Sequence, residues 1–197
     1  MDRLADAGFD VVHAFDAQRT ARVPGLEWLA GAERLGLLVG NTRGLWPRFK
    51  AAMADPELAS HSDPLDRYTE RTIETAFPGA RAFYGHRQYD GAFVPLQRLA
   101  VATGLGALAA NQLVIHPIYG PWFALRAAIV IDGEPVERTP IEPPCRCGDA
   151  CAVTLRAALA APDDRRAWLA VRDACTLRTW RYDDEQIRYH YERAPWL

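Results

Sequence analysis

The sequence predicts a layered fold of the α/β or α+β class. Segments with strand character alternate along the 197 residues with segments of helical character, a pattern that places helices against a sheet. Hydrophobic residues make up 49% and charged residues 24%, so the chain is long and apolar enough to bury a substantial core. We see no internal repeat and no boundary between composition types, and we expect a single domain over residues 1–197.

Strands are predicted where apolar and β-branched residues cluster between turn signals. These segments are residues 9–15, 34–40, 81–84, 113–115 and 122–131. Residues 134–144 contain several prolines and are expected to form an extended surface loop, because proline interrupts both helices and ladders.

Helices are predicted between and after these strands. In the first of them Pro47 is tolerable because it falls in the first turn, and in the second Ser62 or Asp63 caps a helix that starts with Pro64. A third ends at the glycines that follow Thr103. The helical segments are residues 45–53, 64–77, 93–103, 153–161, 162–174 and 182–191.

Residues 112–131 form the most informative stretch. Two apolar segments flank a turn that contains a titratable imidazole, two prolines, a glycine and an aromatic ring, and we expect the segments to form a strand pair. A histidine at a strand end is a plausible ligand-facing group, although a lone histidine is more often structural. The turn residues are His116, Pro117, Tyr119, Gly120 and Pro121.

Arg126 stands near the middle of the second apolar segment. A buried guanidinium costs several kcal/mol, on the order of the penalties known for buried ions, unless an anion pairs with it. Its partner is either a helix carboxylate such as Asp173 or a carboxylate of a bound ligand, held in a bidentate clamp. Both interpretations are consistent with the sequence.

Net charge and hydropathy exclude several classes of function. The formal charge of −2 offers no basic surface for nucleic acid, and no apolar run is long enough for a membrane helix. The first residues lack the basic-then-apolar order of a secretory signal, so we expect a cytoplasmic protein with no membrane partner.

The four cysteines are unevenly distributed. Cys145, Cys147 and Cys151 crowd into a loop that runs into a helix, and Cys175 lies apart. A disulfide scaffold is not expected in a chain of this length without a secretory signal. Thiolates at this spacing can hold zinc or an iron–sulfur cluster, but four ligands are usual, and Cys175 supplies the fourth only if the fold brings it close. Metal binding, redox chemistry and unligated thiols therefore all stay open.

The segment Ile115-His-Pro-Ile-Tyr-Gly-Pro-Trp-Phe-Ala-Leu-Arg126 resembles the CblC (MMACHC) family of cobalamin-processing proteins, whose segment reads I-H-P-x-x-G-x-W-F-A-x-R. Further blocks agree in the same order, so the similarity spans nearly the whole chain. These blocks are residues 8–12, 62–66, 172–174 and 181–186.

The resemblance implies an α+β fold of the flavin-reductase/nitroreductase type, with a mixed sheet flanked by helices and a large cobalamin pocket. Family members remove the upper axial ligand of cobalamin, by reductive decyanation or by thiol-dependent dealkylation, and pass the cofactor on. The resemblance implies that Arg126 and Arg172 contact glutathione. It places the cobalamin contacts at the turn, the following strand and a position near a family histidine: His116, Pro117, Tyr119, Gly120, Trp122, Phe123 and Thr103.

The partners that the resemblance implies are cobalamin and a small thiol, with glutathione, another thiol or reduced flavin as the reductant. It leaves open a homodimer and a downstream protein that accepts the cofactor.

Residues 94–106, Asn111 and the cysteines are similar to cobalamin-dependent epoxyqueuosine reductases, which carry ferredoxin-like C-x2-C-x2-C-x3-C-P runs. Only C-x-C-x3-C is present here. Two alternatives to an enzyme that removes the upper axial ligand stay open. One is a non-catalytic cobalamin carrier, and the other is an iron–sulfur cobalamin reductase.

Overall fold

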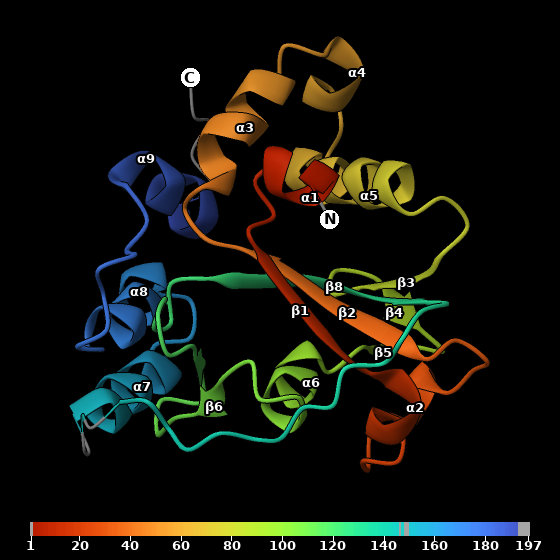
Figure 1. Ribbon diagram of the computed structural model, residues 1–197. Coiled ribbons are helices and arrows are strands. Elements are labelled where there is room, and N and C mark those ends of the chain that lie inside the picture. Colours follow the sequence, from red (N-terminus) through yellow and green to blue (C-terminus); the bar gives the residue numbers. More distant parts are fainter. Residues whose placement is uncertain (1, 146, 148–149, 193–197) are drawn as a thin grey trace.

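A four-stranded sheet with helices on both faces forms the centre of the molecule (Figure 1). The computed structural model describes residues 2–145, 147 and 150–192. The strands of the sheet lie in the order β1 (Val11–Asp16), β2 (Leu35–Asn41), β8 (Ala124–Ile131) and β3 (Arg81–Tyr84). The helices before the last strand are α1 (Asp2–Asp6), α2 (Ala17–Thr20), η1 (Glu27–Leu29), α3 (Leu45–Ala52), α4 (Pro56–Ala59), α5 (Pro64–Ala76) and α6 (Leu96–Ala102). None of the helices in the part of the chain that the structure describes is long and apolar enough to cross a membrane.

The predicted α+β class is confirmed, but the expected mixed sheet is wrong, because every pairing between described strands of this sheet is antiparallel. The strand–helix–strand order of β2, α3 to α5 and β3 does make β2 and β3 run in the same direction. They are not neighbours, however, because β8 lies between them and pairs with both in the opposite direction. The helices therefore cover the sheet without joining adjacent parallel strands.

The two faces of the sheet are buried against different helices. In β2, Leu38 packs on the face that α6 covers, whereas Leu37 and Val39 pack on the face that α1, α3 and α5 cover. This alternation is the period of two that a strand imposes on its side chains, and burial on both faces explains why β2 is apolar up to Asn41 at its end. Figure 1 shows α1, α3 and α5 above the sheet and α6 below it.

The expected strand pair around the turn at residues 116–121 is wrong. β7 (Val114–Ile115) pairs with the short β6 (Ala107–Leu108), and β8 pairs only with β2 and β3 among the described strands. The turn closes on itself, since His116 and Gly120 exchange two backbone hydrogen bonds of 2.9 Å. Pro121 has no N–H to extend this ladder, and β8 begins three residues later.

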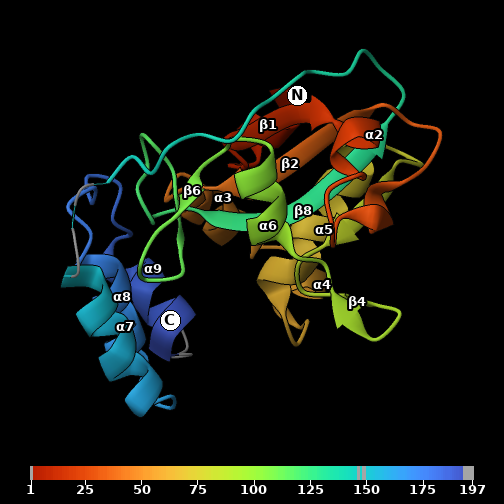
Figure 2. The same ribbon diagram turned by 90° about the horizontal axis from the view of Figure 1, so that it is seen from below.

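Two further predictions concern the segments around α6. The helix begins at Leu96 and not at residue 93, because Phe93 belongs to a small hairpin of β4 (Gln88–Tyr89) and β5 (Ala92–Phe93). The proline-rich residues 134–144 form no helix or strand, as expected, and run along β1 at the edge of the sheet (Figure 2). Arg138 Nε donates to the carbonyl of Ala14 in β1 at 3.1 Å, so this loop covers part of the open edge.

The C-terminal helices gather at one end of the sheet (Figure 2). Asp164 caps α8 by accepting backbone hydrogen bonds from Arg166 and Ala167, and Asp183 caps α9 by accepting one from Gln186. Trp122, just before β8, is fully buried against Tyr182 near the last helices. These helices are α7 (Ala150–Ala160), α8 (Arg165–Asp173), α9 (Asp184–Ile187) and the π-helix η2 (Arg188–Glu192).

Candidate functional site

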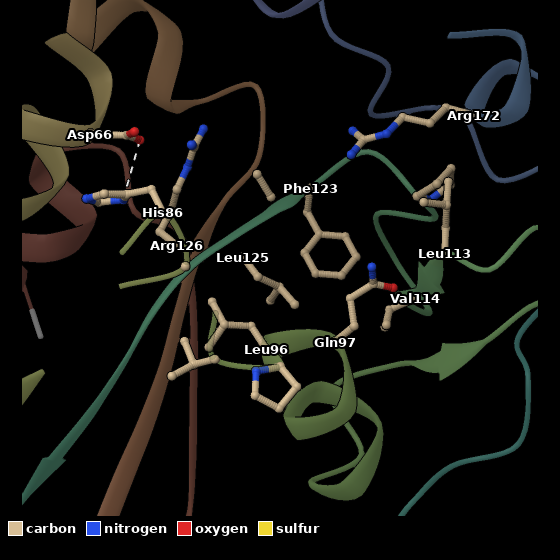
Figure 3. A pocket seen from close by; sticks show the side chains of 15 residues that line it. Asp66, His86, Leu96, Gln97, Leu113, Val114, Phe123, Leu125, Arg126 and Arg172 are labelled. Atoms are coloured by element: carbon tan, nitrogen blue, oxygen red, sulfur yellow. Dashed lines mark ion pairs between the residues drawn. The ribbon is translucent and has the colours of Figure 1, made fainter. Parts of the chain in front are cut away.

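A cavity of about 650 Å³ lies between β8, α6, β7 and the end of α8. Its apolar lining includes Leu96, Val114, Phe123 and Leu125, and its polar lining is Asp66, His86, Gln97, Arg126 and Arg172 (Figure 3). A second hollow of about 660 Å³ lies at α1, α3 and α5, but its Asp55 and Arg71 are already paired at 2.6 Å. The first cavity is the better candidate because it combines apolar walls with converging polar groups.

Arg126 reaches this cavity because it is the extra residue of a β-bulge. Val39 in β2 pairs with Ala127 in β8. The next residue, Gly40, pairs with Leu125, so Arg126 has no partner in register. A bulge of this kind interrupts the alternation of side chains and re-aims one of them. The bulge explains how the middle of an apolar strand accommodates a cation.

The guanidinium of Arg126 is only partly satisfied by the protein. Nε donates to Oδ1 of the fully buried Asn41 at 2.7 Å, whereas Nη2 is buried and has no hydrogen-bond partner among the described residues. Burial lowers the pKa of Arg126, and Asp66 is among the nearby groups that oppose this shift. Of the two partners considered for Arg126, the helix carboxylate Asp173 is wrong, because Asp173 pairs with Arg181 at 2.7 Å.

Several other buried polar atoms at this end of the sheet lack partners in the described structure. Each such atom costs free energy unless water, a ligand or another part of the chain satisfies it. Burial, together with the charges of Arg126 and Arg172, lowers the pKa of His190 to about 3. The atoms are Trp122 Nε1, Tyr182 Oη, Gln186 Nε2, Gln186 Oε1 and His190 Nε2.

Arg172, the other predicted contact of a thiol ligand, enters the cavity from α8 (Figure 3). Its guanidinium lies 5.9 Å from the ring centroids of both Trp122 and Tyr182, which orient it by cation–π contacts. The structure thus brings Arg126 and Arg172 to one cavity from separate elements.

Sequence reasoning missed a set of ionisable groups on the same cavity. Nδ1 of His86 faces Asp66 at 3.5 Å, and its Nε2 donates to Glu70 at 2.8 Å. Burial opposes ionisation of Glu70, but hydrogen bonds from Arg87 and His86 hold the pKa of that carboxyl below its ordinary value. His86 follows the third predicted strand at an ordinary turn, and no spacing pattern in the sequence marks it.

The turn residues lie beside the cavity and have structural roles in the described structure. Nδ1 of His116 accepts backbone hydrogen bonds from Ile118 and Tyr119 at 3.0 and 3.2 Å, and the Tyr119 ring stacks on the imidazole at 4.4 Å. Burial, reinforced by His13, lowers the pKa of His116 to about 4. An imidazole that accepts at Nδ1 carries its proton on Nε2, so neither nitrogen offers a free lone pair in this arrangement.

The other residues predicted to contact cobalamin fall into three groups. Phe123 lines the cavity. Trp122 and Gly120 are buried beside it, and Pro117 is exposed at the tip of the turn. Thr103 is buried at the end of α6, where its hydroxyl donates to the carbonyl of Leu99 at 2.8 Å. A cobalamin contact of Thr103 stays a prediction.

No disulfide joins the cysteines among the described residues. Cys151 and Cys175 are buried, and Cys145 and Cys147 are half-buried. Within residues 2–145, 147 and 150–192, no group of three or more histidine, cysteine, aspartate or glutamate side chains is arranged to hold a metal ion.

Comparison with solved structures shows which fold this is. The chain superposes on the Caenorhabditis elegans B12-trafficking protein CblC, a human MMACHC homologue, with a TM-score of 0.65 over 99% of this chain and 89% of that one. At 16% sequence identity the match shows a shared fold, and it confirms the predicted structural resemblance to CblC. No protein-family model and no curated protein matches the sequence.

Epoxyqueuosine reductases match more weakly. The enzyme from Streptococcus thermophilus gives a TM-score of 0.43 at 14% identity, over 78% of this chain and 50% of that one. The enzyme from Bacillus subtilis gives 0.41 at 16% identity, over 76% and 50%. These scores are too low to add to the argument.

Proposed function

We propose that this chain binds cobalamin, removes its upper axial ligand and passes the cofactor to an acceptor protein. The observation that carries the proposal is the CblC fold over 99% of the chain, with a cavity at which two arginines meet. The proposal treats residues 1–197 as a single cobalamin-binding domain. It also relates the fold to the flavin-reductase and nitroreductase class.

The lining of the cavity supports a ligand of this chemistry. A corrin is an apolar macrocycle with polar amide side chains, and the cavity combines apolar walls with polar groups such as Gln97. Nη2 of Arg126, which has no partner among the described residues, is a donor available to an amide oxygen or a carboxylate. Bound cobalamin would supply the metal-centred redox chemistry of the reaction.

The protein's own residues would bind and orient a second reactant. Arg126 and Arg172 offer guanidinium donors to the carboxylates of a small acidic thiol such as glutathione. The apolar side chains of Phe123 and Leu125 would exclude water from the part of the cavity between the two arginines. His86, with Asp66 and Glu70 on its two nitrogens, holds a proton at the edge of the cavity.

The visible spectrum of cobalamin tests the proposal. Adding the protein to cyanocobalamin should shift the spectrum toward the base-off form, and no shift at saturating protein would refute cobalamin binding. Arg126→Met should lower thiol-dependent dealkylation of an alkylcobalamin by about 10- to 100-fold, the effect of losing one or two charge-assisted hydrogen bonds, while binding changes less.

Arg98→Met is the matched control, because Arg98 is exposed on α6 and donates to the carbonyl of Pro24 away from the cavity. Equal loss of binding and dealkylation in Arg126→Met would assign that arginine to the fold alone. Binding without ligand removal by glutathione, another thiol or reduced flavin would refute the enzymatic half and favour a carrier.

A further inference from the structure

Three cysteines, Cys145, Cys147 and Cys175, lie together where the loop before α7 meets the segment after α8. Two of them, Cys145 and Cys175, lie far apart in sequence, yet both thiols are within hydrogen-bonding reach of the Cys147 sulfur. Cys151, in the first turn of α7, is near enough to Cys145 for its charge to be felt there. The fold therefore supplies the proximity that the sequence spacing alone left open.

Cys147 has the environment of a reactive thiol. Its Sγ lies 3.5 Å from the Thr176 hydroxyl, and hydrogen bonds from that hydroxyl and from the Thr176 backbone lower the pKa of Cys147. The side chain is half-buried, so small molecules can reach it. Partial exposure combined with a stabilised thiolate distinguishes reactive cysteines from inert buried ones.

Cys175 has the environment of a second, protected thiol. It is only 2% exposed, and burial together with the neighbouring Cys147 and Cys145 raises its pKa to about 11. It is therefore protonated at neutral pH, in contrast to the stabilised thiolate of Cys147. Thr176 follows Cys175 directly and bonds to Cys147, so this contact holds the two cysteine segments together.

We infer that Cys147 and Cys175 form a dithiol–disulfide exchange site for small-molecule disulfides, with Cys147 as the attacking thiol and Cys175 as the resolving thiol. The Cys147 thiolate attacks one sulfur of the disulfide RSSR, forms a mixed disulfide and releases RS⁻, which takes up a proton. Cys175 loses its proton to solvent and attacks Sγ of Cys147. This second step forms the Cys147–Cys175 bond and releases the second RS⁻, which is also protonated. Two protein thiols are oxidised, and one disulfide is reduced to two thiols.

Peptide mapping tests the exchange directly. The reduced full-length Cys151→Ser variant is incubated with glutathione disulfide, alkylated and digested with trypsin. Cleavage after Arg146 separates Cys145 from Cys147, so each of the three cysteines left in this variant can be followed on its own peptide. We expect one disulfide between the peptides of Cys147 and Cys175. In the same background, Cys175→Ser should accumulate a stable glutathione adduct on Cys147, and Cys147→Ser should react at least about tenfold more slowly.

Thr176 variants test the activating contact separately from the disulfide. Thr176→Val should slow alkylation of Cys147 at neutral pH by a few-fold, because it removes the hydroxyl donor, and Thr176→Ser should restore the rate. The wild-type protein is the control for the Cys151→Ser background, and Cys147 should react with glutathione disulfide at the same rate in both proteins.

Other outcomes would overturn the inference. A disulfide from Cys147 to Cys145 refutes the role of Cys175, and reaction no faster than that of the urea-unfolded chain refutes activation of Cys147. Tight binding of one Zn²⁺ by the reduced protein, with loss of alkylation at all four cysteines, assigns the cluster to metal binding.

Discussion

The two arginines on the adjacent strands β3 and β8 are satisfied in opposite ways. Arg81, opposite Val130 at one end of the sheet, donates to the carbonyls of Trp28 and Leu29 at 3.2 and 2.9 Å and pairs with Glu33 at 3.1 Å. Arg126, toward the other end of β8, has one bond to Asn41 and a buried Nη2 without a partner among the described residues.

The contrast separates a structural cation from one available to a ligand. A guanidinium saturated by its own chain gains nothing further from a ligand, whereas one that keeps a desolvated donor gains a charge-assisted hydrogen bond when an acceptor arrives. Among the described residues, side-chain atoms of Tyr182 and His190 near Arg126 also lack hydrogen-bond partners. We expect changes at the two ends to separate stability from binding.

The largest effect should come from Gly120→Ala at the Arg126 end. Gly120 has φ +59°, and a Cβ there would collide with the carbonyl oxygen of Leu177, so the turn and the segment after α8 must move apart. We expect a loss of about 2–4 kcal/mol in the free energy of unfolding, measured by urea denaturation.

Gly79→Ala, near the Arg81 end, is the control for the backbone strain alone. Gly79 has φ +77°, and a Cβ added there would meet nothing within 4 Å, so only about 1 kcal/mol should be lost. Equal losses in the two variants would show that the contact with Leu177 is unimportant.

Acid should weaken the Arg126 end through His190. Its folded pKa of about 3 lies below the ordinary value of 6.5, so below pH 6.5 the unfolded chain binds a proton that the folded chain does not. Stability is therefore fully present above pH 6.5 and falls as the pH is lowered toward 3. At pH 5 the loss should reach about 2 kcal/mol from this residue.

His190→Phe keeps a ring among Tyr182 and Tyr189 and removes the titration. The difference in unfolding free energy between pH 7 and pH 5 should shrink by a similar amount in this variant. An unchanged difference would mean that His190 takes up its proton at pH 5 in the folded protein, as it does in the unfolded chain.

Replacing each arginine by methionine should then distinguish the two ends. Arg81→Met leaves two carbonyls and Glu33 without their donor and should lower the free energy of unfolding by about 1–2 kcal/mol. Arg126→Met removes a poorly satisfied cation at the cost of the bond to Asn41, so its net effect should stay within about 1 kcal/mol. A larger stability loss in Arg126→Met than in Arg81→Met would make Arg126 the structural cation and refute its assignment to ligand binding.

Local sequence patterns predict most helices and strands of this fold. They do not predict how the residues of the site come together. The predicted strands and most predicted helices lie close to the observed ones because period, caps and prolines act within a few residues. The partners of β7 and β8 depend on which distant strands compete for them, and no local signal encodes that choice. The bulge at Arg126 is likewise a property of the pairing with β2. The contact between Cys147 and Cys175 also depends on segments that are distant in the sequence, so no local pattern predicts it.

The smallest effect concerns His116, where a structural role and a metal-binding role predict different results. His116→Asn keeps a side-chain acceptor for the backbone N–H groups of Ile118 and Tyr119, whereas His116→Ala leaves both without one. We expect the asparagine variant to be more stable than the alanine variant by about 1 kcal/mol, measured by urea denaturation. If His116 serves the turn alone, both variants should give bound cobalamin the wild-type spectrum. A changed cobalamin spectrum in His116→Asn, at unchanged stability, would instead make this imidazole a ligand of the cobalt, and the turn would then belong to the same ligand-accepting end as Arg126.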